Sequence, residues 1–304
     1  MTRPRWTLAD MPDLAGTRAV VTGVTAGLGT ATALELARAG AEVVLVARSA
    51  DRLATTQRQL EAAVPGAVLH PVIADLADLS SVRRGAAEIG RLGPVHVLVN
   101  NAGVMALPYA RTVDGFEMQL GTNHLGPFLL TGLLLPQLVA SGQGRVVAVA
   151  SQAHRFARRA PLDDPRVLTG RYSRWGAYGA SKLANLMTTF ELDRRARAAG
   201  LPVKALAAHP GYSATELVGK TGGLGGQIMT AATRLLGQRA ELGALPTLMA
   251  ATADLPGSTY IGPDGLGQMR GYPRIVSPRR LARDEDAQRR LWELSELATG
   301  VRYP

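Results

Sequence analysis

The chain of 304 residues contains 46% hydrophobic and 19% charged residues, which is typical of a globular protein and excludes an intrinsically disordered one. It contains no cysteine, which excludes a disulfide framework, a thiolate metal site and a cysteine nucleophile. Its formal net charge of +10 raises the possibility of a polyanionic partner, but the arginines are scattered rather than clustered with aromatic residues, so we expect no nucleic-acid partner.

Short apolar segments alternate with segments of helical spacing along most of the chain. Strands are expected at residues 18–22, 42–47, 68–74, 95–99, 145–150, 203–208 and 258–261. Helices are expected at residues 29–39, 50–64, 79–90, 112–138 (with a bend at Gly126-Pro127) and 175–199. Because short buried strands that alternate with helices pair in parallel, the pattern predicts an α/β protein with a mainly parallel seven-stranded sheet and helices on both faces.

Alternating strands and helices form either a closed barrel or an open doubly wound sheet, and the glycines of the first strand–helix turn favour the open, Rossmann-type sheet. We find no internal repeat and no proline-rich linker, so a single domain is expected over residues 1–304. Its cofactor half spans about 15–150, and its catalytic and substrate half about 151–304. The irregular segment 212–238 contains a glycine-rich run and is expected to act as a lid over the site.

The first strand–helix turn, residues 22–29, has the glycine spacing G-x-x-x-G-x-G. Glycines let the backbone turn sharply and let a pyrophosphate approach the helix N-terminus, where free N–H groups and the helix dipole favour negative charge. Turn glycines without a ligand are the alternative, but the position between an apolar strand and a helix favours dinucleotide binding. The residues expected to contact the dinucleotide here are Gly23, Thr25, Ala26, Gly27, Leu28 and Gly29.

The second strand ends at Ala47-Arg48-Ser49, without the acidic residue that would bind ribose hydroxyls and repel a 2′-phosphate. Arg48 is instead a fork-shaped cation suited to phosphate, which favours NADP(H) over NAD(H); a solvated surface arginine is the alternative. Asp75, followed by Leu76, ends the third strand. It is a candidate acceptor for an adenine amino group and equally a candidate acid at a helix N-terminus.

Tyr178 and Lys182 lie four residues apart on the helix expected at 175–199, and therefore on one face of it. A free tyrosine hydroxyl has a pKa of about 10, and a neighbouring ammonium lowers that pKa by stabilising the phenolate. Lysine is scarce, because Lys182, Lys204 and Lys220 are the three in the chain. An accidental Tyr-x-x-x-Lys pair is therefore improbable, although a surface pair is the alternative interpretation.

These motifs, with four others in chain order, resemble the short-chain dehydrogenase/reductase family across almost the whole chain. The other motifs are Asn100-Asn101-Ala102-Gly103, Asn123, Ser151 and Pro210-Gly211, each placed at the end of an expected strand or in the helix at 112–138. The stretch 100–136 looks most like the retinol dehydrogenase and protochlorophyllide reductase branch. Six motifs in this order are far more specific than any one of them.

The resemblance implies a catalytic site of Asn123, Ser151, Tyr178 and Lys182. Tyr178 would exchange a proton with the substrate oxygen, and Ser151 would hydrogen-bond that oxygen. Lys182 would lower the tyrosine pKa and hold the nicotinamide ribose, while Asn123 would hold a water of a proton relay. The further cofactor contacts that it implies are Asn101, Ala102, Gly103, Tyr178, Lys182, Pro210, Gly211 and Thr215, and no metal is implied.

We therefore expect an NADP(H)-dependent oxidoreductase that interconverts a carbonyl compound and an alcohol. The alternative is a non-catalytic dinucleotide-binding regulatory protein, against which the four catalytic-type residues argue. The substrate is expected to be a lipophilic small molecule, since the expected pocket segments 105–111, 152–174 and 212–238 mix apolar residues with arginine. A homo-oligomer is left open. With no apolar run of about 20 residues and no signal-peptide core, no membrane span and a cytoplasmic location are expected.

Three histidines invite interpretation as ligands. His124 and His154 have no metal-ligand spacing between them, and His209 stands directly before Pro210. We expect all three to be structural.

Overall fold

The computed structural model of the protein describes residues 5–168, 170–212 and 239–304. Thr215 and residues 213–238 of the expected lid lie outside this part of the chain, so the expectations about them remain predictions.

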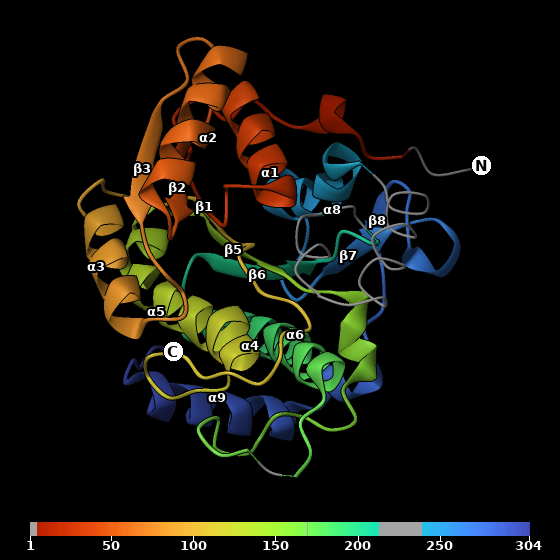
Figure 1. The fold of residues 1–304 in the computed structure, drawn as a ribbon. Coiled ribbons are helices and arrows are strands. Elements are labelled where there is room, and N and C mark those ends of the chain that lie inside the picture. The colour runs from red at the N-terminus through yellow and green to blue at the C-terminus, as the bar shows by residue number, and fades with distance from the viewer. Residues whose placement is uncertain (1–4, 169, 213–238) are drawn as a thin grey trace.

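One sheet of eight strands runs through the molecule in the order β3-β2-β1-β4-β5-β6-β7-β8 (Figure 1). The strands are β1 Arg18–Thr22, β2 Glu42–Ala47, β3 Leu69–Ile73, β4 Val97–Asn100, β5 Gly144–Val149, β6 Val203–Ala208, β7 Tyr260–Pro263 and β8 Pro273–Ile275. The first seven pair in parallel, and β8 pairs antiparallel with β7. The strand order reverses between β1 and β4, and the crevice at such a point is where open α/β sheets bind ligands.

The expected number of seven strands was one too few. Strand β8 has three residues, of which Arg274 and Ile275 are exposed, and begins with a proline. An edge strand this short carries no hydrophobic periodicity, and proline is tolerated there because one side of the strand needs no hydrogen-bonding partner.

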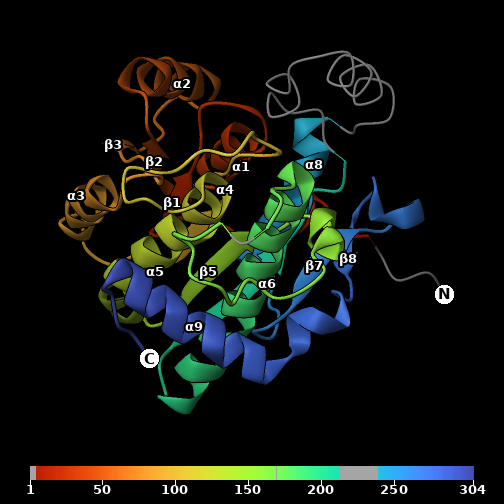
Figure 2. The same ribbon diagram turned by 60° about the horizontal axis from the view of Figure 1, so that its bottom comes forward.

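Helices cover both faces of the sheet, as expected for a doubly wound fold. They are α1 Gly27–Arg38, α2 Ala50–Ala63, α3 Leu79–Gly90, α4 Met118–Leu120, α5 Gly126–Ala140, α6 Arg174–Ala198, α8 Ala240–Thr252 and α9 Glu285–Thr299. Helices α1, α2 and α8 pack on one face, and α3, α5 and α6 pack on the other. Figure 2 shows α9 lying across the outer side of α5 and α6.

Burial on both faces explains why the strands are apolar without alternation. Val20 packs among the side chains of the α3 and α5 layer, while its neighbours Ala19 and Val21 pack toward α1 and α8. All three side chains are fully buried. Each residue of a central parallel strand therefore faces a helix layer, and a continuous run of small and branched apolar residues results.

The helix expected over 112–138 is interrupted and begins later than expected. Residues before Met118 form a tight loop. An isolated antiparallel β-bridge joins the backbones of Arg111 and Glu117, and Gly115 between them has φ +83°. A π-helical turn, η2 Gly121–Leu125, then joins α4 to α5. The bend therefore lies one turn before Gly126-Pro127, and Pro127 sits in the first turn of α5, where its missing N–H costs little.

Candidate active site

The glycine-rich turn after β1 is shaped by close backbone approach. Gly23 has φ +73°, and a Cβ there would lie 2.8 Å from the Cα of Ala102. A Cβ on Gly29 would lie 2.2 Å from the carbonyl oxygen of Gly23. The Oγ1 of Thr22 accepts hydrogen bonds from the amides of Asn101 and Ala102, both at 3.0 Å. These bonds pack the expected cofactor segments after β1 and β4 against each other.

The N-terminus of α1 has the character that a pyrophosphate requires. Its N-cap, Ala26, provides no side-chain hydrogen bond, and the first turn contains no acidic residue. The amides at this end therefore meet neither a capping oxygen nor a repelling carboxylate from their own turn, and the helix dipole favours an anion there. This chemistry fits the pyrophosphate of a dinucleotide, which Gly27, Leu28 and Gly29 would bind.

Arg48 is exposed directly after β2 and forms no hydrogen bond or ion pair with the residues that the structure describes. A second arginine, which the sequence did not single out, lies one helical turn further on. The guanidinium of Arg52 donates a hydrogen bond to the carbonyl oxygen of Thr25 at 3.2 Å, in the glycine-rich turn. Arg52 is the third residue of α2, four residues after Arg48 along the chain. The two arginines place positive charge beside the expected adenosine end of the site.

Asp75 and Leu76 follow β3 at the same edge of the sheet. One carboxylate oxygen of Asp75 accepts a hydrogen bond from the amide of Ala77 at 3.0 Å. The N-cap of α3 is Asp78, which accepts from the amides of Ser80 and Ser81. Asp75 lies three residues before this N-cap and does not itself cap α3, and its role as an adenine acceptor remains a prediction. The side chain of Leu76 is buried in the core.

Tyr178, Lys182 and Ser151 meet where β5 ends against α6. The side chain of Ser151 lies close enough to that of Tyr178 to act toward a lower tyrosine pKa. The ammonium of Lys182 donates to the carbonyl oxygen of Val149 at 2.8 Å and lies 5.9 Å from the centroid of the Tyr178 ring. Tyr178 and Lys182 are both buried, so the three polar groups converge in a largely desolvated corner.

The pKa shifts in this corner differ from the expectation. Burial raises the pKa of Tyr178 to about 12, against the opposing effect of Ser151. Burial also lowers the pKa of Lys182 to about 8. Desolvation disfavours the phenolate and the ammonium alike, and the bond from Lys182 to Val149 does not offset it. In the protein by itself Tyr178 is therefore a neutral phenol at pH 7, a proton donor rather than a base.

Asn123 lies in the π-helical turn η2 and is 1% exposed. Its amide is fully used: Oδ1 accepts from the Val104 amide at 2.7 Å, and Nδ2 donates to the Val104 carbonyl and to Ser181 Oγ, both at 2.9 Å. A Cβ on Gly103 would lie 2.9 Å from Asn123 Oδ1 and 3.5 Å from Lys182 Nζ. Asn123 therefore holds the loop after β4 against α6, while its part in a proton relay remains a prediction.

The turn after β6 brings Pro210 and Gly211 to the same edge of the sheet. Gly211 has φ +70°, and a Cβ there would lie 2.4 Å from the carbonyl oxygen of Met269. The Gly211 amide donates to Nδ1 of His209 at 3.2 Å, and the Tyr212 amide donates to the Met269 carbonyl at 2.6 Å. The expected carboxamide contact at Thr215 lies outside the described residues.

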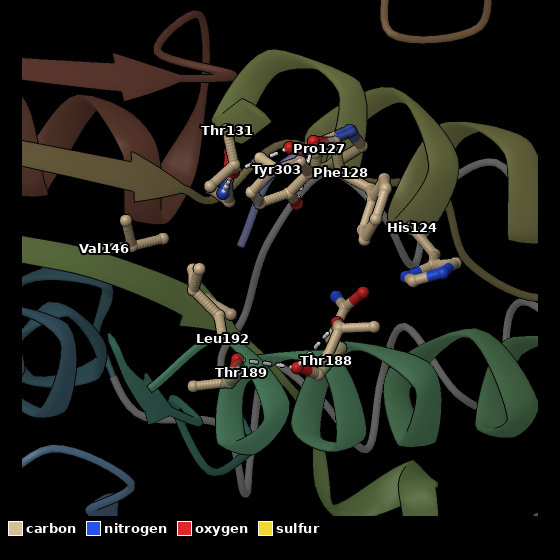
Figure 3. Close-up of a pocket in the computed structure, with 12 residues that line it drawn as sticks. His124, Pro127, Phe128, Thr131, Val146, Thr188, Thr189, Leu192 and Tyr303 are labelled. Atoms are coloured by element: carbon tan, nitrogen blue, oxygen red, sulfur yellow. Dashed lines mark hydrogen bonds between the residues drawn. The ribbon is translucent and has the colours of Figure 1, made fainter. Parts of the chain in front are cut away.

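A small cavity behind this corner is not the substrate site. Figure 3 shows it between α5 and α6, with Thr131 and Tyr303 opposite Thr188 and Leu192. Its volume of about 40 Å³ is close to the space that one water molecule occupies. The buried Oδ1 of Asn100 has no hydrogen-bond partner there, while its Nδ2 donates to Thr131 at 3.0 Å.

In the described part of the chain, no group of three or more His, Asp or Glu side chains is placed to hold a metal ion. None of the helices described there is both long enough and apolar enough to cross a bilayer.

The sequence of the chain is similar to a known family over most of its length. The short chain dehydrogenase family pattern matches residues 17–161. Human retinol dehydrogenase 13 is 38% identical over 299 residues, which covers 95% of this chain and 86% of that protein.

Solved structures share the fold as well. A protein from Mycobacterium paratuberculosis is 44% identical with a TM-score of 0.82, over 99% of this chain and 100% of that one. A structure from Beutenbergia cavernae, described as an NAD(P)-dependent gluconate 5-dehydrogenase with bound NADP, is 29% identical with a TM-score of 0.62, over 79% and 91%. With the glycine-rich turn and the Ser–Tyr–Lys corner, these likenesses show that the chain belongs to the short-chain dehydrogenase/reductase family, in its retinol dehydrogenase-like branch, and is an oxidoreductase that binds a nicotinamide dinucleotide.

Proposed function

We propose that the protein is an NADP(H)-dependent oxidoreductase that interconverts a lipophilic carbonyl compound and its primary or secondary alcohol. The observation that carries the proposal is the placement of Ser151 beside Tyr178, close enough to act on its pKa, in a buried corner with Lys182. This corner lies at the carboxyl edge of the same sheet whose β1 turn would bind the dinucleotide. Residues of about 15–150 would thus bind the cofactor, and residues after 150 the substrate.

In the proposed reaction, a bound nicotinamide dinucleotide supplies or accepts the hydride. Tyr178 donates the proton to the substrate oxygen during carbonyl reduction, and its raised pKa keeps it in the protonated form at neutral pH. Ser151 donates a hydrogen bond to the same oxygen and stabilises the charge that develops there. The ammonium of Lys182 lies 5.9 Å from the centroid of the Tyr178 ring, and it would bind ribose hydroxyls while Asn123 holds the adjoining loop in place.

Preference for NADP(H) is supported by the residues around the adenosine end of the site. Arg48 follows β2, Arg52 reaches the glycine-rich turn, and no acidic residue ends β2. The Beutenbergia cavernae structure is described as holding NADP, which supports the same preference. A 2′-phosphate placed between the two guanidinium groups would form charge-assisted hydrogen bonds.

A lipophilic substrate is supported by aromatic side chains that lead to Tyr178. The ring of Trp175 lies 6.0 Å from that of Tyr178 and 6.4 Å from that of Phe156, both edge-on. Phe156 is 60% exposed, so this path begins at the surface and ends at the proposed acid. The name of the retinol dehydrogenase relative refers to a lipophilic alcohol, which supports the same class.

The test has two stages. NADPH and NADH are first titrated while nucleotide fluorescence is followed, and NADPH oxidation is then measured at the nicotinamide absorbance band with a panel of aliphatic and aromatic aldehydes and ketones. Tighter binding of NADPH and turnover of bulky apolar carbonyls are expected. Binding without turnover of any carbonyl or alcohol would favour the non-catalytic alternative, and tighter binding of NADH would overturn the cofactor assignment.

A further inference from the structure

Two buried histidines flank the ring of Tyr260 behind the Ser151–Tyr178 corner. His154 lies in the short helix η3 Gln152–Phe156, directly after Ser151, and His209 follows β6. Both are 0% exposed. The Tyr260 ring lies 5.8 Å from His154, edge-on, and 5.3 Å from His209. One aromatic stack thus connects the turn that carries the serine with the turn that carries Pro210 and Gly211.

The hydrogen bonds of His154 determine its tautomer. The backbone amide of Arg279 points at Nε2 from 3.1 Å, and an amide can only donate, so Nε2 is an acceptor without a proton. Nδ1 lies 2.7 Å from the carbonyl oxygen of Ser151, which can only accept. The proton is therefore on Nδ1, and the ring is neutral. The donated bond fixes the carbonyl of the residue whose hydroxyl meets Tyr178.

His209 has the opposite tautomer for the same reason. The Gly211 amide donates to Nδ1 at 3.2 Å, so Nδ1 carries no proton. Nε2 lies 3.1 Å from Oε1 of Gln268 and donates to it. A Cβ on Gly262 would lie 2.0 Å from this Nε2, so the glycine of β7 leaves the space that the ring needs. His209 thus holds the Pro210-Gly211 turn from one ring nitrogen and Gln268 from the other.

Gln268 and Arg279 complete the connection between the two turns. Oε1 of Gln268 also accepts a hydrogen bond from Nε2 of Gln152 at 2.6 Å, so one amide oxygen joins η3 to His209. Gln268 has φ +57°, a conformation that costs a non-glycine residue energy and persists only where its surroundings hold it. The guanidinium of Arg279 donates to the carbonyl oxygens of Arg155 and Ala157, on either side of η3's last residue.

The charges around the pair favour the neutral rings. Arg155 and Arg279 face His154, and Arg155 also faces His209. Burial lowers the pKa of both histidines to about 4, and these guanidinium groups act in the same direction. A proton on either acceptor nitrogen would face an amide N–H, so it would break the bond that holds the turn.

We propose that His154 and His209 are positioning residues for the reaction, and that each holds one catalytic turn through a fixed and opposite tautomer. His154 places Ser151 against Tyr178, and His209 places the Pro210-Gly211 turn against the nicotinamide end of the cofactor. The inference rests on the proposed function for its kinetic consequences, but the tautomers and the turn contacts do not depend on catalysis.

The test uses substitutions that keep one half of each histidine's bonding. Asparagine places an amide at the position of Nδ1, and glutamine places one at the position of Nε2. His154→Asn therefore keeps the bond to Ser151 and loses the bond from Arg279, whereas His154→Gln does the reverse. His209→Asn keeps the bond from Gly211, and His209→Gln keeps the bond to Gln268. All four lose the aromatic ring, and the melting temperature of each variant shows how far its packing is disturbed. His96→Asn, at the opposite edge of the sheet, is the control for removing a histidine elsewhere.

For His154, we expect the glutamine variant to lose kcat by about 10- to 100-fold through misplacement of Ser151, and the asparagine variant to stay within about threefold of wild type. The dissociation constant for NADPH should be unchanged in both. Equal kcat in two variants of equal melting temperature would overturn the positioning role, because packing alone does not distinguish them.

For His209, we expect the glutamine variant to raise the dissociation constant for the cofactor by about tenfold, the worth of one hydrogen bond, and the asparagine variant to keep it near the wild-type value. Hydrogen exchange at the Gly211 amide should be faster in the glutamine variant and near the wild-type rate in the asparagine variant. Identical exchange at Gly211 in both variants would contradict the assignment.

A readout without catalysis separates this inference from the proposed function. In the ¹⁵N spectrum of the imidazole groups at pH 7, His154 should show the Nδ1–H tautomer and His209 the Nε2–H tautomer, assigned by loss of signals in the variants. Observation of both tautomers with no turnover would refute the proposed function and retain the histidine assignment. A cationic ring, or the same tautomer in both, would refute the histidine assignment even if the enzyme is active.

Discussion

The turn after β1 and the two turns after β5 and β6 lie at the same edge of one sheet, but their shapes are held in different ways. In the β1 turn, glycines let backbone segments pack within distances that no side chain tolerates, as at Gly23 and Gly29. In the β5 and β6 turns, side chains of His154, His209 and Gln268 hold the backbone through hydrogen bonds. The glycines of the first turn should therefore be most sensitive to added atoms, and the other two turns should in addition lose their shape when the donors and acceptors of His154, His209 and Gln268 are removed.

The largest effect should come from removing the hydroxyl group of Tyr178, beside the turn after β5. Tyr178→Phe keeps the ring and its contact with Trp175 but removes the transferable proton, so carbonyl reduction should fall by about 10²- to 10⁴-fold with little change in melting temperature. Steady-state kinetics with NADPH and a confirmed carbonyl measure the loss. Tyr272→Phe, at a tyrosine whose ring packs under the Arg5 guanidinium, is the control and should retain the wild-type rate. Near-wild-type turnover by Tyr178→Phe would exclude it as the acid.

The glycine-rich turn after β1 should lose stability and cofactor affinity when a single methyl group is added. In Gly29→Ala, the new Cβ would meet the Gly23 carbonyl oxygen at 2.2 Å, so overpacking should cost about 1–3 kcal/mol of stability and sharply weaken dinucleotide binding. Gly200→Ala is the matched control, since it has φ +64° and open space around it. That control should lose about 1–2 kcal/mol of stability through its backbone conformation while it keeps cofactor affinity. Equal affinity in both variants would show that the β1 turn tolerates expansion.

Cofactor selectivity tests whether the surface charge of Arg48 contributes to binding of the 2′-phosphate. Arg48→Ala should weaken NADPH binding by about 10- to 100-fold, the worth of a charge-assisted hydrogen bond, and leave NADH almost unchanged. Only NADPH carries the 2′-phosphate. Titration calorimetry with both nucleotides measures the ratio, and Arg58→Ala on the exposed side of α2 controls for loss of general positive charge. An equal loss for both nucleotides would remove Arg48 from the site.

Stability against pH tests the buried histidines of the β5 and β6 turns together with His124 of η2. Burial lowers the pKa of His124 to about 3 and those of His154 and His209 to about 4, from 6.5. Because the unfolded chain binds these protons first, the full contribution to stability is present above pH 6.5 and is lost progressively as the pH falls toward 4. Each histidine contributes about 1.4 kcal/mol per pH unit at most in that window.

Melting temperatures between pH 7 and pH 5 measure this loss. Glu42 and Asp78, whose pKa values are lowered from 4.5 and 3.8, titrate below this range. His154→Asn should flatten the decline, and an unchanged slope would show that folding does not lower the pKa of His154.

The sequence was a good guide wherever one local pattern determines one element. Strand β6 and helix α3 have the predicted bounds, because an apolar run buried on both faces and an amphipathic segment after Asp78 each carry a complete signal. The glycines of the β1 turn and the Tyr178–Lys182 pair were also readable, since both follow from spacing along the chain. Helix α9 was missed although its signals were present, with Asp284 as N-cap and Gly300 at φ +68° as its end.

Other features of the structure could not be predicted from local sequence patterns. The π-helical turn η2 differs from an α-helix by one residue in its hydrogen bonding, and the sequence Gly121–Leu125 does not distinguish the two. His154 and His209 are 55 residues apart and meet through Tyr260, which comes later still, so their joint role follows from the fold alone. The predicted direction of the Tyr178 pKa shift was wrong. The spacing of residues along a helix indicates which groups are neighbours, but it does not indicate how strongly those groups are desolvated.

The position of α9 sets an order of events during synthesis. Trp292 of α9 is fully buried, with its ring 4.9 Å from Phe128 of α5 and 4.7 Å from Tyr303. These residues leave the ribosome roughly 100 residues after Tyr178, which at about 5–20 residues per second is a delay of several seconds. During that interval α5 and α6 expose the apolar surface that α9 later covers. The catalytic residues are therefore synthesised before the helix that packs behind α5 and α6. At this stage the nascent chain exposes the apolar surface that a chaperone would shield.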